Sequence, residues 1–268
     1  MVMGIINMGM DSFSGDCVAG ADTAIAKAGT MIEDGAEIID IGGESARTNR
    51  PAIEVSREID TLLDFVRLYQ KAGFRALLSI NTWRPEVARA VLEIGGDLLN
   101  DIGGLPDAGN AAICAETGAA LLIMHTVGLP KIPHTHMEYA DVMAALDTFF
   151  LSRLSLAGKA GLNLNQIVLD PGIDFAKQRR DNLRIYRELT QLRKFERPIL
   201  LPVSRKTVID DVLGIPNPAE RDPGTVACIV AGYLRGAQIF RVHNVKAATQ
   251  ALRICEAVLN EREGFSDE

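Results

Sequence analysis

The chain has 268 residues, nearly half of them hydrophobic, and a formal net charge of −7 at pH 7. This length fits one large α/β domain, and the acidic charge excludes a basic field that would recruit nucleic acid or an anionic membrane. No apolar run approaches the roughly 20 residues of a membrane span, and no signal-peptide pattern opens the chain. The four cysteines are scattered without CxxC or cysteine–histidine ligand spacing. We therefore expect a cytoplasmic protein that binds any anionic ligand through local positive groups.

Apolar segments typical of buried strands alternate along the chain with helical patterns. The first strand, 2–7, runs into a polar loop and then an alanine-rich helix over about 22–34. The remaining expected strands are 37–41, 75–80, 98–101, 119–124, 166–169, 198–203 and the stretch 238–244. Further helices are expected around 59–66, after Pro85, between 172 and 198, and over about 139–160 and 248–259, and a segment over 224–235 precedes the last strand.

Eight strand–helix units without an internal linker predict one α/β domain over residues 1–268, a (β/α)8 or TIM barrel. A doubly wound open sheet is the alternative, and the even run of eight units favours the barrel. The acidic tail, 261–268, is expected to be solvated and disordered. The connection 126–137 carries Pro130 and Pro133, and its length is typical of a mobile loop that covers a site.

Polar side chains follow most of these strands, at the end of the barrel where such folds carry their chemistry. Arg241 and His243 lie two positions apart, so both can point to one side and bind a phosphate-like anion. A surface salt bridge beside a hydrogen-bonded histidine is the structural alternative. Asp170 follows a fully apolar strand, so its carboxylate requires a donor pair such as an amino-pyrimidine edge or an arginine, and Lys206 is a possible protein partner.

The other strand-end candidates each have a structural alternative, which for asparagine and aspartate is a role in turns or helix caps. They are Asn7, Glu44, Arg47, Asn81, Asn100, Asp101, His125 and Ser204. The histidines lack paired spacing on an expected helix, so the sequence indicates no zinc site.

Taken in order, short motifs at the strand ends make the whole chain resemble the dihydropteroate synthase family. The matching blocks are residues 3–7 with 11–14, 38–45, 100–102, 124–125, 169–172 followed by Phe175 and Lys177, then 204–206, 224–225 and 241–243.

The resemblance implies a transferase of folate biosynthesis. Its reaction joins 6-hydroxymethyl-7,8-dihydropterin diphosphate to an aromatic amine, p-aminobenzoate, and releases pyrophosphate with the help of Mg²⁺. The implied pterin pocket consists of Asp170, Asn100, Lys206 and Asn81. The implied diphosphate and second-substrate site consists of Asn7, Arg47, Ser204, Arg241 and His243. The implied catalytic residues are Lys206, Arg241, His243 and Asn7, and Asn7 is also the implied Mg²⁺ ligand. The resemblance also implies a homodimer.

Several positions depart from the family pattern. Residues 8–10, Met-Gly-Met, replace a usual Val-Thr-Pro, and 46–49 keep only the arginine of Thr-Arg-Pro-Gly. Asn81 and Asn244 replace usual aspartates, and Asp174 replaces a small residue. Because the two altered loops shape the p-aminobenzoate site, the alternatives are a pterin-binding relative without synthase activity or one that uses another amine. A pterin-dependent methyltransferase ranks last, since it handles no diphosphate.

Overall fold

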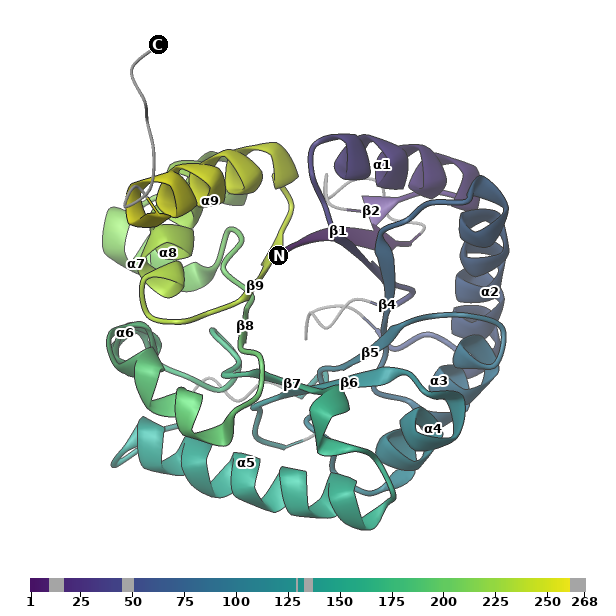
Figure 1. Cartoon of the computed structure of the whole chain (residues 1–268), viewed down its shortest axis with the longest axis horizontal. Coiled ribbons are helices and arrows are strands. Elements are labelled where there is room, and N and C mark those ends of the chain that lie inside the picture. Colours follow the sequence, from purple (N-terminus) through teal and green to yellow (C-terminus); the bar gives the residue numbers. More distant parts are fainter. Residues whose placement is uncertain (10–16, 45–50, 129, 133–136, 261–268) are drawn as a thin grey trace.

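Eight parallel strands form a sheet that closes on itself, with helices around its outside (Figure 1). The computed structural model describes residues 1–9, 17–44, 51–128, 130–132 and 137–260, and the structural statements below concern these residues. The strands follow the order β7-β6-β5-β4-β3-β1-β9-β8. A parallel bridge between Leu169 and Ile199 joins the two ends of this order. The predicted (β/α)8 barrel is therefore confirmed, and the open sheet is excluded.

The elements occupy the segments that the sequence predicts, with a few differences. The barrel strands are β1 (Val2–Met8), β3 (Ile38–Gly42), β4 (Leu77–Asn81), β5 (Leu98–Asp101), β6 (Ala120–Met124), β7 (Ile167–Asp170), β8 (Leu200–Leu201) and β9 (Ile239–Val242). The helices are α1 (Ala21–Glu33), α2 (Val55–Ala72), α3 (Pro85–Leu92), α4 (Gly109–Thr117), α5 (Val142–Lys159), α6 (Arg179–Glu188), α7 (Thr207–Leu213), α8 (Asp222–Tyr233) and α9 (Val245–Asn260). The elements α4, α7 and a two-residue strand β2 (Cys17–Val18), which pairs with β1, lie where the sequence predicts none.

The strand β8 is shorter than its prediction. An apolar run over 198–203 predicts a strand of six residues, but only Leu200 and Leu201 form one. Pro198 and Pro202 flank this pair, and proline has no N–H to donate to a sheet ladder.

Side chains of the strands alternate between the helix-covered face and the barrel interior. The interior holds its own apolar cluster, made by Met3, Ile38, Leu98, Leu122, Met124, Val168, Leu200 and Ile239. Four polar residues each follow a member of this cluster by two positions, so their side chains face the same interior. They are Asp40 after Ile38, Asn100 after Leu98, Asp170 after Val168 and Arg241 after Ile239. The strand sequences thus build an apolar floor with a polar layer above it, towards the carboxyl ends of the strands.

The helices pack their apolar faces on the outer side of the strands. The N-termini of α5 and α6 are capped: the Asp141 carboxylate accepts the N–H groups of Met143 and Ala144, and Gln178 and Asp181 form a capping box. No helix in the described part of the chain is long and apolar enough to cross a bilayer. The predicted solvated tail, 261–268, lies outside the described residues.

Candidate active site

A buried aspartate that strand-end reasoning overlooked lies at the centre of the polar layer. Asp40 on β3 is fully buried. Its Oδ1 accepts hydrogen bonds from Ser79 Oγ (2.6 Å) and Asn100 Nδ2 (3.1 Å), and its Oδ2 accepts from Arg241 Nε (2.7 Å) and Asn81 Nδ2 (3.3 Å). Four donors from three other strands therefore compensate a carboxylate that would be costly to bury alone.

This contact fixes the cation of the predicted anion site. The Arg241 guanidinium is bound to Asp40 through Nε, and its side chain is 20% exposed, so its terminal nitrogens can donate to a ligand. The amides of Asn81 and Asn100 are likewise anchored by one N–H each, and each still has an oxygen acceptor and a second N–H. Asp40 thus orders three of the predicted ligand residues.

Asp170 lies in the same interior, at the end of β7. Its side chain is buried, and its Oδ1 accepts the backbone N–H of Gly172 (2.7 Å). Burial raises the pKa of Asp170 to about 6, against the opposing effects of the Gly172 hydrogen bond and the positive charges of Lys206 and Lys177. A ligand that donates two hydrogen bonds to Asp170 would stabilise the ionised form.

Lys206 is close to Asp170 but does not pair with it directly. Its Nζ donates to the Ile173 carbonyl (2.9 Å) and lies 4.8 Å from the centroid of the Phe175 ring. The predicted ion pair between Lys206 and Asp170 is therefore wrong as a direct contact, although the lysine's charge reaches the carboxylate. The loop after β7 captures the ammonium group instead.

Lys177, a buried lysine whose charge acts on Asp170, was not assigned a role by the sequence. The Nζ of Lys177 contacts His125 Nδ1 (2.8 Å) and the carbonyls of Phe175 (3.0 Å) and His125 (3.4 Å). Burial lowers the pKa of Lys177 to about 7 and that of His125 to about 2. The His125 ring also packs on Phe149, with centroids 4.7 Å apart. His125 is thus a neutral residue held between Lys177 and Phe149, a structural role that strand-end reasoning did not specify.

His243 is held in place by the predicted residue Ser204. The Ser204 Oγ accepts the backbone N–H of His243 (3.1 Å) and lies 2.8 Å from its Nδ1. This gives Ser204 an orienting function besides the diphosphate contact predicted for it.

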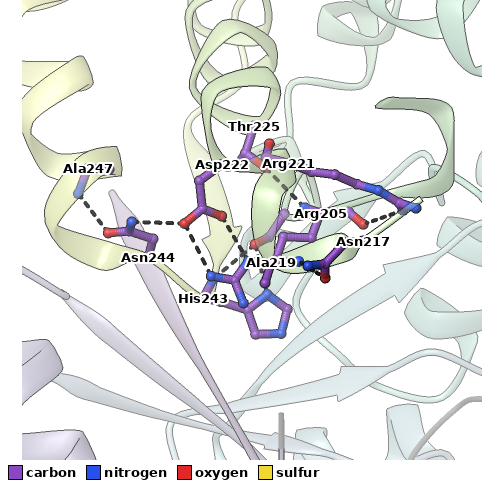
Figure 2. A network of polar contacts seen from close by, with 10 residues as sticks. Arg205, Asn217, Ala219, Arg221, Asp222, Thr225, His243, Asn244 and Ala247 are labelled. Carbon is purple, nitrogen blue, oxygen red and sulfur yellow. Dashed lines mark hydrogen bonds and ion pairs between the residues drawn. The ribbon is translucent and has the colours of Figure 1, made fainter. Parts of the chain in front are cut away.

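The turn after His243 is tied down by a polar network (Figure 2). Asp222 accepts two hydrogen bonds from Arg205 (2.8 and 3.1 Å) and one from Asn244 Nδ2 (3.0 Å). The Asn244 Oδ1 accepts the Ala247 N–H in the first turn of α9 (3.1 Å). A second carboxylate at position 244 would face Asp222, so the neutral amide suits this network.

Asp101 points to the opposite side from its neighbour Asn100. Its carboxylate accepts the N–H of Gly103 (2.8 Å) and an amide N–H of Asn110 on α4 (2.9 Å). Burial raises the pKa of Asp101 to about 6. Asp101 therefore serves the turn after β5, as its structural alternative predicts.

Part of the long connection after β6 reaches the loop after β3. Lys131 Nζ lies 3.0 Å from Glu44 Oε1 and donates to the Pro51 carbonyl (3.2 Å). Arg84 bridges Glu44 (2.8 Å) and the buried Glu58 (2.9 Å). Glu44 thus anchors the base of the loop that carries the predicted ligand Arg47, which lies outside the described residues.

Asn7 lies at the end of β1, half-buried, opposite Gly42 in the register. The described residues contain no cluster of three or more histidine, cysteine or acidic side chains that could hold a metal ion.

The comparisons with known proteins agree with this geometry. Residues 3–243 match a family model described as pterin binding enzyme. Dihydropteroate synthase of Escherichia coli K12 is 35% identical over 263 residues, which cover 98% of this chain and 93% of that protein. The structure of Yersinia pestis dihydropteroate synthase with a sulfonamide drug has a TM-score of 0.90 at 35% identity, covering 97% of this chain and 94% of that one. The structure of the Xanthomonas albilineans enzyme with 7,8-dihydropteroate has a TM-score of 0.85 at 32% identity, covering 96% and 93%.

Proposed function

The chain belongs to the pterin-binding enzymes, and from this we propose that it is a transferase of the dihydropteroate synthase type. It joins the pterinylmethyl group of 6-hydroxymethyl-7,8-dihydropterin diphosphate to p-aminobenzoate and releases pyrophosphate. One observation carries this proposal: a buried carboxylate, Asp170, and an anchored cation, Arg241, face the same barrel interior. This pairing suits a substrate with a hydrogen-bond-donating heterocycle at one end and a diphosphate at the other.

The pterin end is recognised by charge and by donor pattern. A pterin presents an amino group and a ring N–H side by side, which match the two oxygens of an ionised carboxylate. Asp170 accepts from this edge, and Lys206 donates to the opposite edge of the ring, where the pterin has acceptors. Asn100 and Asn81, oriented by Asp40, supply further amide groups.

The diphosphate end is stabilised as it leaves. The bond between the methylene carbon and the diphosphate oxygen breaks, both electrons leave with pyrophosphate, and the electron-rich pterin delocalises the positive charge. The amine nitrogen then forms the new C–N bond, and its proton passes to solvent. Arg241 and His243 are fixed by Asp40 and Ser204 before the reaction, so they can stabilise the departing anion without reorganising.

We propose that Mg²⁺ enters with the diphosphate. Mg²⁺ usually keeps several waters and takes few protein ligands beside substrate phosphates. One amide oxygen from Asn7, without a carboxylate cluster among the described residues, fits such an ion. When bound, the ion would neutralise part of the negative charge of the diphosphate.

We also propose a homodimer and a cytoplasmic location. Support for the dimer comes from exposed apolar side chains on α7 and α9 and just after α8: Val212, Leu213, Leu234, Ile254 and Val258. The helices α7, α8 and α9 lie on one side of the barrel (Figure 1). The thiols of Cys114, Cys228 and Cys255 form no disulfide, which suits a reducing compartment.

The test is to incubate the protein with the pterin diphosphate, p-aminobenzoate and Mg²⁺, measuring pyrophosphate and dihydropteroate together. We expect equal amounts of both. An enzyme that binds pteroic acid but forms no product at high concentration would be a pterin-binding relative without synthase activity. Weaker pteroic acid binding by Asp170→Asn is the control for the site.

A further inference from the structure

Asp174 is a carboxylate beside the pterin pocket that the proposed reaction does not use. It lies in the loop between β7 and α6, half-buried, with a φ of +67°. Aspartate is among the few residues other than glycine that adopt this region readily. The family pattern has a small residue here, so the side chain is a departure that requires its own explanation.

The Asp174 side chain joins three elements. Its carboxylate accepts the backbone N–H groups of Thr207 and Val208, the first two residues of α7. It also accepts an amide N–H from Asn182 on α6 (3.0 Å), and the Asn182 Oδ1 accepts the Asp174 backbone N–H (2.9 Å). The start of α7 is thereby capped from outside, because its own N-cap residue, Lys206, makes no capping hydrogen bond.

The same loop also holds the side chain of Lys206. Its Nζ donates to the carbonyl of Ile173, the residue before Asp174, and lies over the ring of Phe175, the residue after it. Backbone and ammonium group of this lysine are therefore both fixed by one short segment, 173–175. Movement of that segment would carry Lys206 with it.

Asp174 is also a counter-charge for this lysine. Burial lowers the pKa of Lys206, and Asp174 is the carboxylate that most opposes this, ahead of Asp170. A bound pterin occupies the oxygens of Asp170 and displaces water from the pocket. The carboxylate of Asp174 faces backbone N–H groups instead of the ligand, so its charge stays available to Lys206 throughout.

We propose that Asp174 is a positioning residue for Lys206, which aims the lysine into the pterin pocket and keeps its ammonium group charged when the pocket closes on a pterin. This inference rests on the proposed function, since it takes the pterin as the ligand of Lys206.

The sign of the pH effect follows from the groups around the two residues. Three other charged groups act on Lys206 or respond to its charge. They are Asp170 on β7, Lys177 in the loop after it, and Arg241 on β9. Asp174 also acts on Lys177 and on the hydroxyl and thiol of Tyr186 and Cys228. Removing its charge lowers the pKa of Lys206 further, so the lysine becomes neutral at a lower pH and pterin affinity falls earlier as pH rises.

The test compares Asp174→Asn, Asp174→Gly and the control Asp211→Asn, which removes an exposed carboxylate from α7, the helix whose start Asp174 caps. Asparagine tolerates a positive φ and keeps an oxygen for the α7 N–H groups, whereas glycine keeps only the backbone freedom. Pteroic acid affinity is measured by calorimetry from about pH 6 to about pH 11, a range that covers the ordinary lysine pKa of about 10.4 and lower values. The KM for each substrate is measured over the same range.

We expect the alkaline fall in affinity to move down by about one pH unit in Asp174→Asn, which is a tenfold loss above that point. The KM for the pterin diphosphate rises with it, and the KM for p-aminobenzoate stays unchanged. Asp174→Gly loses affinity at every pH, and Asp211→Asn matches the parent. An unchanged pH profile in Asp174→Asn, or an equal loss at every pH, would overturn the inference.

A ligand-free measurement separates this inference from the proposed function. The Nζ of Lys206 is titrated by ¹⁵N NMR, with Lys206→Arg identifying its signal. A downward shift of that titration in Asp174→Asn without any pterin binding would support the link and refute the pterin site. Pterin binding by the parent protein with no shift of the titration would refute the link alone.

Discussion

Replacing Asp40 by asparagine tests whether this residue holds the site together. The substitution keeps the shape but removes the charge that receives Arg241 Nε at 2.7 Å. A charge-assisted hydrogen bond contributes about 1.5–3 kcal/mol, and breaking a buried ion pair costs about 3–5 kcal/mol. Asp40 is fully buried but the Arg241 side chain is 20% exposed, so water can solvate the released cation. We therefore expect a loss near the lower end, about 3 kcal/mol in the free energy of unfolding.

The catalytic effect of Asp40→Asn follows from the same contact. A guanidinium that is no longer anchored donates less effectively to the leaving diphosphate, and we expect kcat to fall about 10²–10³-fold. Urea unfolding and pyrophosphate release are the assays. Ser79→Ala is the matched control, because it removes one neutral donor to Asp40 and should cost about 1 kcal/mol with kcat nearly unchanged. A double-mutant cycle of Asp40→Asn with Arg241→Gln that gives a coupling energy below about 0.5 kcal/mol would refute the reasoning.

Four further predictions concern Asp170, the loop after β7 and the metal ion. Burial raises the pKa of Asp170 to about 6, so affinity for a neutral pterin should fall as pH drops below that value. This loss of affinity at acid pH should be absent in Asp170→Asn, which binds pterin weakly. Because the raised pKa disfavours the ionised carboxyl in the folded protein, the parent should lose about 3 kcal/mol in its free energy of unfolding, relative to Asp170→Asn, as pH rises from about 4 through the folded pKa. A difference between the two proteins in urea unfolding that does not depend on pH would contradict this. Ala176 has a φ of +50°, so Ala176→Gly should raise the free energy of unfolding by about 0.5 kcal/mol; a lower melting temperature would count against strain there. EDTA should abolish pyrophosphate release while leaving pteroic acid binding intact, and loss of both would place the ion in the pterin pocket.

The barrel and most of the candidate site follow from a local rule in the sequence. A polar residue that continues an inward-facing strand position must enter the barrel interior, which places Asn100, Asp170 and Arg241 correctly. Asp40 follows the same rule, but it lies in the middle of an apolar strand, so a search restricted to strand ends misses it. Its signal is present all the same: it is the one charged residue of Ile-Ile-Asp-Ile, in phase with the inward-facing Ile38.

Other features depend on contacts that no local pattern contains. The partner of Lys177 is a ring nitrogen of His125, 52 positions earlier in the chain. The ammonium group of Lys206 binds a carbonyl of the preceding unit, 33 positions away, instead of the carboxylate assigned to it. Such choices are decided by which loop backbone packs closest, and the sequence predicts only that a partner must exist.

The short strand β8 has a consequence for how the enzyme holds its substrate. The circle of strands is completed next to it by a bridge between Leu169 and Ile199 and by the hydrogen bond from Leu169 N–H to the Pro198 carbonyl. Asp170 lies at the end of β7, on one side of this contact, and Lys206 follows β8, on the other side. A pterin bound by both residues would therefore also link the two strands that close the barrel. Substrate binding and closure of the barrel would then stabilise each other.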